Sequence, residues 1–254
     1  MSVPAALPGQ TPAAPAYYQV INLVKVTPGK STEYADFVRE TSMKTAQKRV
    51  EAGEIYSWTL LRTVVPGGKE ARADYMVSVL SEGPPRAPQS REDLEKSLKA
   101  AGVKLSASEF LAKRDSLSSL VNTEIWRPQL RVGALQKGHY LYLNYMKVVD
   151  AAAYTKFETD VWRPMAEQWT KDGAMSGWMY ATKQLPGGTE TPYSAYSADM
   201  FSTWDAAFQS RPAQAMFEKV HPGKSYADAS KEIPKLRDLA RRELWVVVER
   251  VVQK

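Results

Sequence analysis

Aromatic side chains concentrated in the second half of the chain are the first candidates for chemistry. Trp162 and Trp169 lie seven residues apart on a predicted helix, beside an apolar stripe that includes Tyr154 and Met165. Together the two stripes are wider than contact with a sheet requires, so they predict a pocket for a flat apolar ligand. The competing interpretation is ordinary core packing. The predicted ligand-binding residues are Trp162, Arg163, Trp169, Trp178, Tyr180 and Tyr196.

Asn144 and His139 are the candidate catalytic residues. Asn144 lies on a predicted strand among apolar side chains, where its amide must find hydrogen-bond partners. It can tie the strand to a helix, or it can orient a substrate oxygen. His139 begins the same strand and can act as a general base or as an axial haem ligand. His221, the second of two histidines, has the same options, but a lone histidine at a helix end is more often a cap or surface residue.

Arg163 has two alternative roles. It can form an exposed ion pair with Glu167, four residues later on the same helix. It can instead point into the pocket near Tyr193 or Tyr196, where it would bind an anionic ligand. We favour the exposed pair.

Composition limits the other kinds of site and partner. The chain of 254 residues contains no cysteine, which excludes disulfides, thiolate metal sites and cysteine nucleophiles. Two isolated histidines do not predict a metal site, and no phosphate-binding glycine loop or nucleophile elbow occurs. No apolar run approaches the roughly 18 residues of a membrane span. The net charge of +6 is spread along the chain. We expect no metal, cofactor, nucleic acid or membrane, but a small apolar or aromatic ligand.

The elements that must position these residues occur twice. Asn22 and Asn144 occupy the same place within similar strands, and other matched residues share nearly the same offset. A constant offset indicates one duplicated unit. The pairs that differ by 120 (154 − 34) are Tyr34 and Tyr154, Phe37 and Phe157, Gly53 and Gly173, and Trp58 and Trp178. We therefore predict a Pro/Ala-rich disordered tail over residues 1–16 and two units over residues 17–133 and 138–254.

Each unit reads β-α-β-β-α-β, the order of a ferredoxin-like fold with both helices on one face of a sheet. The fourth strands carry Glu124-Ile125-Trp126 and Glu243-Leu244-Trp245 and should begin near Thr123 and Arg242, because helical patterning precedes them. Their apolar residues on both sides require that the second sheet face is covered as well. The predicted fold class is α+β, with the two units packed sheet to sheet as an α/β barrel within one chain.

The chain resembles the dimeric α/β-barrel superfamily, and within it the antibiotic-biosynthesis-monooxygenase-like branch. The resemblance is carried by the strand NYMKV, the helix VWRPMAEQWTKDG, the strand GWMY, the turn PGGT and the closing strand ELWVVVE. It implies the barrel, but no single activity, since the superfamily includes cofactor-free monooxygenases, isomerases and haem-associated members. A tandem barrel already contains the usual dimer contact, so a monomer or a homodimer is expected.

Three functional hypotheses follow. The first is a non-catalytic or small-ligand-binding barrel. The second is a cofactor-free monooxygenase or isomerase that acts on an aromatic or polyketide-like substrate in the second unit. The third is a haem-associated barrel. The composition of the tail is typical of exported proteins after removal of a signal peptide, so we expect a periplasmic or secreted location.

Overall fold

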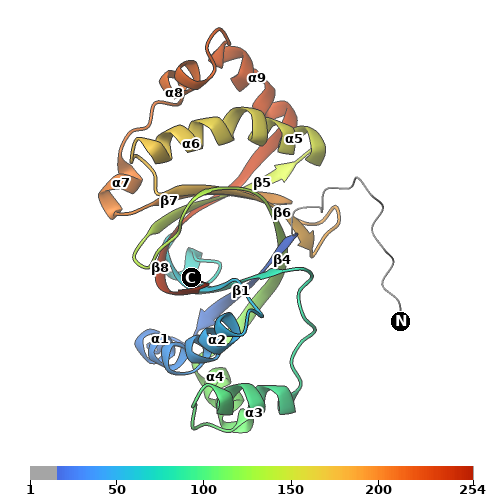
Figure 1. Ribbon diagram of the computed structural model, residues 1–254, viewed down its shortest axis with the longest axis vertical. Coiled ribbons are helices and arrows are strands. Elements are labelled where there is room, and N and C mark those ends of the chain that lie inside the picture. Colours follow the sequence, from blue (N-terminus) through green and yellow to red (C-terminus); the bar gives the residue numbers. More distant parts are fainter. Residues whose placement is uncertain (1–15, 254) are drawn as a thin grey trace.

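The computed structural model describes residues 16–253, so the predicted tail lies outside the described residues except for Ala16. Eight antiparallel strands close into a barrel in the order β1-β3-β2-β8-β5-β7-β6-β4 (Figure 1). The strands are β1 (Tyr17–Val26), β2 (Ser57–Val65), β3 (Tyr75–Glu82), β4 (Ser118–Gly133), β5 (Tyr140–Val148), β6 (Gly177–Leu185), β7 (Ala195–Phe201) and β8 (Arg237–Val252).

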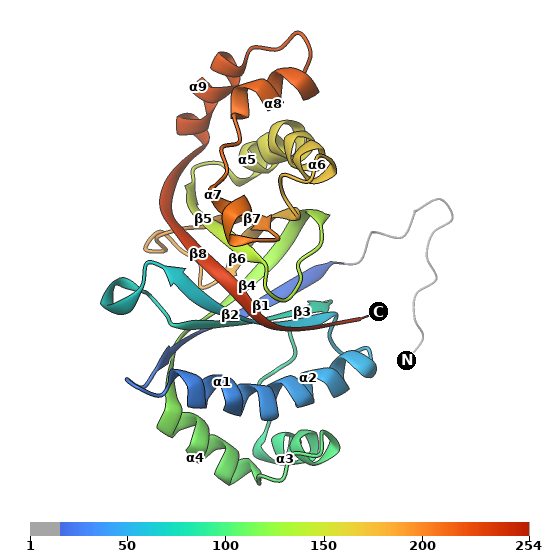
Figure 2. The same ribbon diagram turned by 90° about the vertical axis from the view of Figure 1, so that its left-hand side faces the viewer.

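The helices form two layers on opposite sides of the barrel (Figures 1 and 2). The first half of the chain supplies α1 (Ser31–Glu40), α2 (Ser42–Glu51), α3 (Arg91–Ala100) and α4 (Ala107–Leu117). The second half supplies α5 (Ala151–Phe157), the π-helical turn η2 (Glu158–Trp162), α6 (Arg163–Lys171), α7 (Trp204–Phe208), α8 (Ala213–Val220) and α9 (Tyr226–Leu236), and a short 3₁₀ turn η1 (Gly68–Glu70) follows β2. No helix of the described residues is both long enough and apolar enough to cross a bilayer.

Each half of the chain keeps the strand order of a ferredoxin-like sheet. In the first half β4, β1, β3 and β2 are neighbours, and in the second half β8, β5, β7 and β6 are neighbours. The two sheets join at their edges, β2 to β8 and β4 to β6. The sheet faces without helices therefore look toward each other across the barrel interior, which confirms the predicted α+β fold.

The fourth strands differ from the prediction because they begin earlier. Both β4 and β8 are 16 residues long, and the helical patterning expected up to Val121 and Arg241 is wrong there. The first part of β4 pairs with β1 in its own sheet, and its second part pairs with β6 of the other sheet. Strand β8 does the same with β5 and β2. Pairing across both sheets thus overrides the local helical pattern.

Two local predictions that position the second helix layer are confirmed. The Asp150 carboxylate accepts hydrogen bonds from the backbone N–H groups of Ala152 and Ala153, as an N-cap should. Gly173 ends the helix with a φ of 76°, and its counterpart Gly53 has a φ of 70°. These turns fix how α5 and α6 lie over the outer face of the second sheet.

Candidate ligand-binding site

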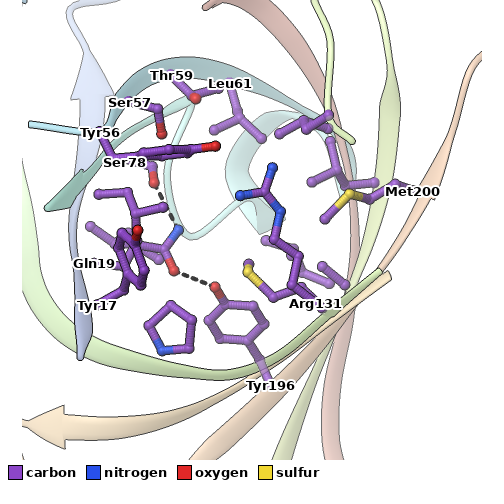
Figure 3. A pocket seen from close by; sticks show the side chains of 18 of the residues that line it. Tyr17, Gln19, Tyr56, Ser57, Thr59, Leu61, Ser78, Arg131, Tyr196 and Met200 are labelled. Atoms are coloured by element: carbon purple, nitrogen blue, oxygen red, sulfur yellow. Dashed lines mark hydrogen bonds between the residues drawn. The ribbon is translucent and has the colours of Figure 1, made fainter. Parts of the chain in front are cut away.

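The barrel interior contains a cavity of about 410 Å³ in the half nearest the start of β1 and the end of β8. Strand residues point alternately inward and outward, so most of the surrounding strands contribute every second position, whereas β4 contributes residues 127–131 around a shift of register. Figure 3 shows these side chains converging on an open centre. Most of the wall is aliphatic or thioether, with Ile21, Leu61, Leu141, Leu143, Met179 and Met200. Such a wall suits the apolar body of a small molecule.

A chain of hydrogen bonds runs across one side of this cavity (Figure 3). The Tyr196 hydroxyl donates to Gln19 Oε1, and Gln19 Nε2 donates to Ser78 Oγ at 2.7 Å. Burial raises the pKa of Tyr196, so its hydroxyl stays neutral in the physiological range. This wall offers neutral donors and acceptors and no formal charge.

The mouth of the cavity is cationic. Arg131 points into the cavity in Figure 3, and Arg250 lines it as well. Arg250 Nη1 donates to the Thr59 hydroxyl at 2.6 Å, whereas the buried Arg250 Nε has no partner. Within residues 16–253, no salt bridge joins either arginine to a carboxylate. Burial, reinforced by repulsion from Arg131, lowers the pKa of Arg250 to about 10.

His139 lies beside this mouth. Its Nδ1 is 3.1 Å from Ser176 Oγ, and its backbone N–H and C=O tie the start of β5 to Gln136 and Val247. Burial lowers the pKa of His139, and the positive charge of Arg250 lowers it further. The imidazole is therefore neutral near pH 7.

The other half of the barrel contains an ionic cluster around two buried glutamates, which we call the Arg72 cluster. It consists of Arg72, Glu124, Glu243, Lys183 and Arg241, with the rings of Tyr145 and Tyr193 beside it. The Arg72 guanidinium lies 3.5 Å from a carboxylate oxygen of each glutamate. Both glutamates are no more than 2% exposed. Arg72 thus bridges the two halves of the chain.

Each glutamate of the cluster has a second cation and a tryptophan. Lys183 Nζ lies 3.0 Å from Glu124, and Arg241 Nε lies 2.6 Å from Glu243. The indole N–H groups of Trp126 and Trp245 donate to the glutamate two residues earlier, at 3.1 and 3.0 Å. The matched Glu-x-Trp segments therefore form equivalent contacts in both sheets.

Four of the predicted ligand-binding residues lie together, but on the outer face of the second sheet rather than in the barrel. Trp178 and Tyr180 are buried between this sheet and its helices, and Trp162 and Trp169 pack against them half-buried. Tyr196 instead lies on the inner face and lines the barrel cavity. Arg163 is exposed and pairs with Glu167 at 2.9 Å, which is the alternative that we favoured. The role of these residues in binding stays a prediction.

Asn144 lies on the outer face, whereas His139 is beside the barrel mouth, so the structure does not bring the two catalytic candidates together. Asn144 Nδ2 donates to Asp199 at 3.0 Å and to Ser197 at 3.3 Å. Its Oδ1 accepts from Arg242 Nε at 2.6 Å. The amide thus has strand partners instead of the predicted helix partner. A catalytic role of Asn144 remains untested.

His221 is buried at the end of α8, where its Nε2 lies 3.2 Å from the Val161 carbonyl oxygen and its ring packs on Phe217. Among residues 16–253, no group of three or more histidine, aspartate or glutamate side chains is placed to hold a metal ion.

Glu158 is a buried acid that the sequence analysis did not single out. It lies in the π-helical turn before Pro164, where the Arg163 N–H bonds to the Glu158 carbonyl in place of a regular α-helical bond. Its carboxylate accepts from the Tyr154 hydroxyl. Burial raises the pKa of Glu158 to about 8, although Tyr154 and Arg237 act against this rise.

The residues that form the barrel site were largely missed from sequence. Arg72 belongs to no repeated motif, since it corresponds to Pro192 at the offset of 120 (192 − 72). The available signs were the repeated Glu-x-Trp segment and the pair Arg131 and Arg250, which match at the offset of that segment (250 − 131 = 119). Side chains two residues apart on a strand lie on the same face of the sheet. Each glutamate therefore had to point toward the same interior as the tryptophan two residues later.

No family model and no curated protein sequence matches the chain. Solved structures do resemble it in fold, and two of them are provisionally named monooxygenases. The one from Lactobacillus acidophilus NCFM has 14% identity and a TM-score of 0.54, and the match covers 94% of this chain and 97% of that one. The one from Fusobacterium nucleatum subsp. nucleatum has 8% identity and a TM-score of 0.55, over 94% and 95% of the two chains.

At such low sequence identity, the activity of one protein cannot be inferred from that of the other. The structural similarity nevertheless extends over nearly the whole length of each chain. It agrees with the closed barrel of two ferredoxin-like sheets. The chain therefore has the fold of the dimeric α/β-barrel superfamily, with both sheets of the barrel contributed by one polypeptide.

Proposed function

We propose that this protein binds a small apolar molecule inside the barrel and holds it by an acidic group of that molecule. The observation that carries the proposal is Arg250, a largely desolvated guanidinium that lines an apolar cavity without a carboxylate partner. Burying a charge without a counter-charge is unfavourable. A ligand acid at the mouth would supply the missing negative charge, while the aliphatic wall would hold the rest of the ligand.

The outer face of the second sheet supports the oxygenase or isomerase hypothesis less well. Trp178 and Tyr180 are packed to 4% and 0% exposure there, and both ends of the Asn144 amide already have partners. The haem hypothesis has little support from His221, because this side chain is packed against Phe217 and directed toward a backbone carbonyl oxygen instead of a cavity. The barrel cavity has both open volume and uncompensated charge, so it is the better-supported site.

The test is calorimetric titration with undecanoate, an aliphatic acid, and with 2-naphthoate, an aromatic acid. Arg250→Met should weaken the binding of whichever acid binds by at least about tenfold, because a charge-assisted hydrogen bond is worth roughly 1.5–3 kcal/mol. The matched control is Arg163→Met, which removes an exposed arginine of the outer helix layer and should leave affinity unchanged. Failure of both acids to bind, or equal binding by Arg250→Met, contradicts the proposal.

The same substitution should stabilise the unliganded protein. Arg250 is charged at pH 7 in a site that disfavours its charge, so Arg250→Met should raise the free energy of unfolding by about 1–2 kcal/mol. If Arg250 served only to stabilise the fold, Arg250→Met would lower the free energy of unfolding instead. Urea unfolding of the wild type and the variant without ligand distinguishes these outcomes.

Binding of an acid should also change the protonation of His139. Arg250 helps to lower the pKa of His139; a bound anion that offsets this charge raises the pKa again, so binding takes up protons. Affinity should therefore increase as the pH falls from about 8 to about 5.5. Calorimetry in buffers of different ionisation enthalpy measures the uptake, and His139→Gln should reduce it. Proton release on binding would contradict this linkage.

A further inference from the structure

Three arginines line the barrel cavity, Arg127, Arg131 and Arg250, and the charges of the last two act on each other. Arg131 projects into the cavity from β4, and Arg250 lines it from β8 (Figure 3). Their charges are close enough for Arg131 to lower the pKa of Arg250. The Arg131 guanidinium lies over the Tyr56 ring, 5.8 Å from its centroid, so it is held beside the mouth.

No carboxylate offsets either charge. The residues that line the cavity include neither aspartate nor glutamate. The Arg72 cluster differs from the mouth in this respect. Its three cations surround two carboxylates, and each cation lies within 3.5 Å of a carboxylate oxygen. The described residues therefore leave the charges of Arg131 and Arg250 at the mouth for a ligand to compensate.

A single carboxylate would compensate only one of these charges. A phosphate monoester carries nearly two negative charges above its second pKa of about 6, and it presents three acceptor oxygens to arginine forks. Arginine suits such a group because its planar donors bind phosphate in pairs. The aliphatic wall formed by Ile21, Leu141 and Met179, among others, suits an alkyl chain better than a ring system.

We propose that the head group held at this mouth is a phosphate monoester on an aliphatic chain, bound between Arg131 and Arg250. The inference rests on the proposed function, since it assumes that the cavity holds a ligand by an acidic group, and it names the class of that group. The neutral wall of Gln19, Ser78 and Tyr196 lies beside the chain and adds no charge.

The experiment compares decyl phosphate with undecanoate, which has a chain of the same length and one negative charge. At pH 8, decyl phosphate should bind at least about tenfold more tightly, and the ratio of affinities should fall toward one near pH 5.5, where the phosphate loses its second charge. The ratio of the two affinities largely cancels the effect of His139 protonation, because this effect changes the affinity of both ligands in the same direction. Inorganic phosphate, which lacks the chain, should bind far more weakly than decyl phosphate.

Two variants make the result specific. Arg131→Met should abolish most of the preference for decyl phosphate while undecanoate still binds within about threefold of wild type, whereas Arg250→Met should weaken both ligands. Arg131 is exposed, so its variant should unfold at the wild-type temperature. Arg62→Met, which removes an exposed arginine of β2 that does not line the cavity, is the matched control and should keep the preference.

The possible failures are distinguishable. Equal affinity for the two ligands overturns the phosphate assignment but leaves the proposed function in place, whereas no binding of either ligand overturns both. Vesicles that contain phosphatidic acid test a membrane source of the same head group. Vesicle binding that Arg131→Met abolishes supports the assignment, and vesicle binding that Arg131→Met leaves unchanged, without binding of monomeric decyl phosphate, overturns it.

Discussion

Arg72→Met should lower the free energy of unfolding by about 3–5 kcal/mol, because it removes one partner from a buried ionic network. Glu124 and Glu243 are each 1–2% exposed and share the Arg72 guanidinium. Methionine fills a similar volume but leaves both carboxylates with one cation each. The same guanidinium donates to Tyr145 Oη at 2.8 Å and bonds to Tyr193, so two buried hydroxyl groups lose a donor as well.

Urea denaturation followed by circular dichroism measures this loss. Adding Glu124→Gln and Glu243→Gln to the Arg72→Met background should recover part of the stability, because the uncompensated negative charges are then removed. Arg163→Met is the control, since an exposed ion pair contributes no more than about 1 kcal/mol. A loss below about 1 kcal/mol for Arg72→Met would show that Lys183 and Arg241 alone neutralise the glutamates.

The repeated pattern of the sequence was sufficient to predict the barrel, because each of the four strands of one half has a counterpart in the other half. Asn22 and Asn144 mark the first strands, and Gly53 and Gly173 end the first long helices. Strands with apolar residues on both faces then required a second sheet. The early start of β4 and β8 was missed, since it depends on pairing with strands of the other unit.

The barrel site was not predicted, although Arg131 and Arg250 occupy matched positions of the two fourth strands (250 − 131 = 119). The predicted pocket rested on aromatic stripes at helical spacing, and these lie in the helix layer that covers the second sheet. Arg131 and Arg250 are isolated arginines in strands, where sequence alone does not distinguish an inward from an outward side chain around a bulge. The register of β8 against β2 shifts near Leu60 and Leu61, so the alternation along β8 is interrupted before Arg250.

Glu158→Gln should remove a fall in stability that the wild type shows as the pH rises. Folded Glu158 keeps its proton up to a pKa of about 8, because burial in the helix layer disfavours the carboxylate. In the unfolded chain the group ionises near its ordinary value of 4.5. Between these values folding takes up one proton, so the free energy of unfolding should decrease by up to about 1.4 kcal/mol per pH unit. Below the lower value the contribution is constant.

The measurement is urea unfolding of wild type and Glu158→Gln between about pH 4.5 and 8, where the difference between the two proteins isolates this group. Tyr154, Arg237 and Asp199 act on the carboxyl group, and of these the negative charge of Asp199 raises the pKa of Glu158 further. The difference should therefore shrink if Asp199→Asn is made in both backgrounds. Glu167→Gln, on the exposed side of α6, is the control and should keep the wild-type pH dependence. Parallel curves for wild type and Glu158→Gln would mean that the buried carboxyl group is ionised in the folded protein, with Arg237 as its counter-charge.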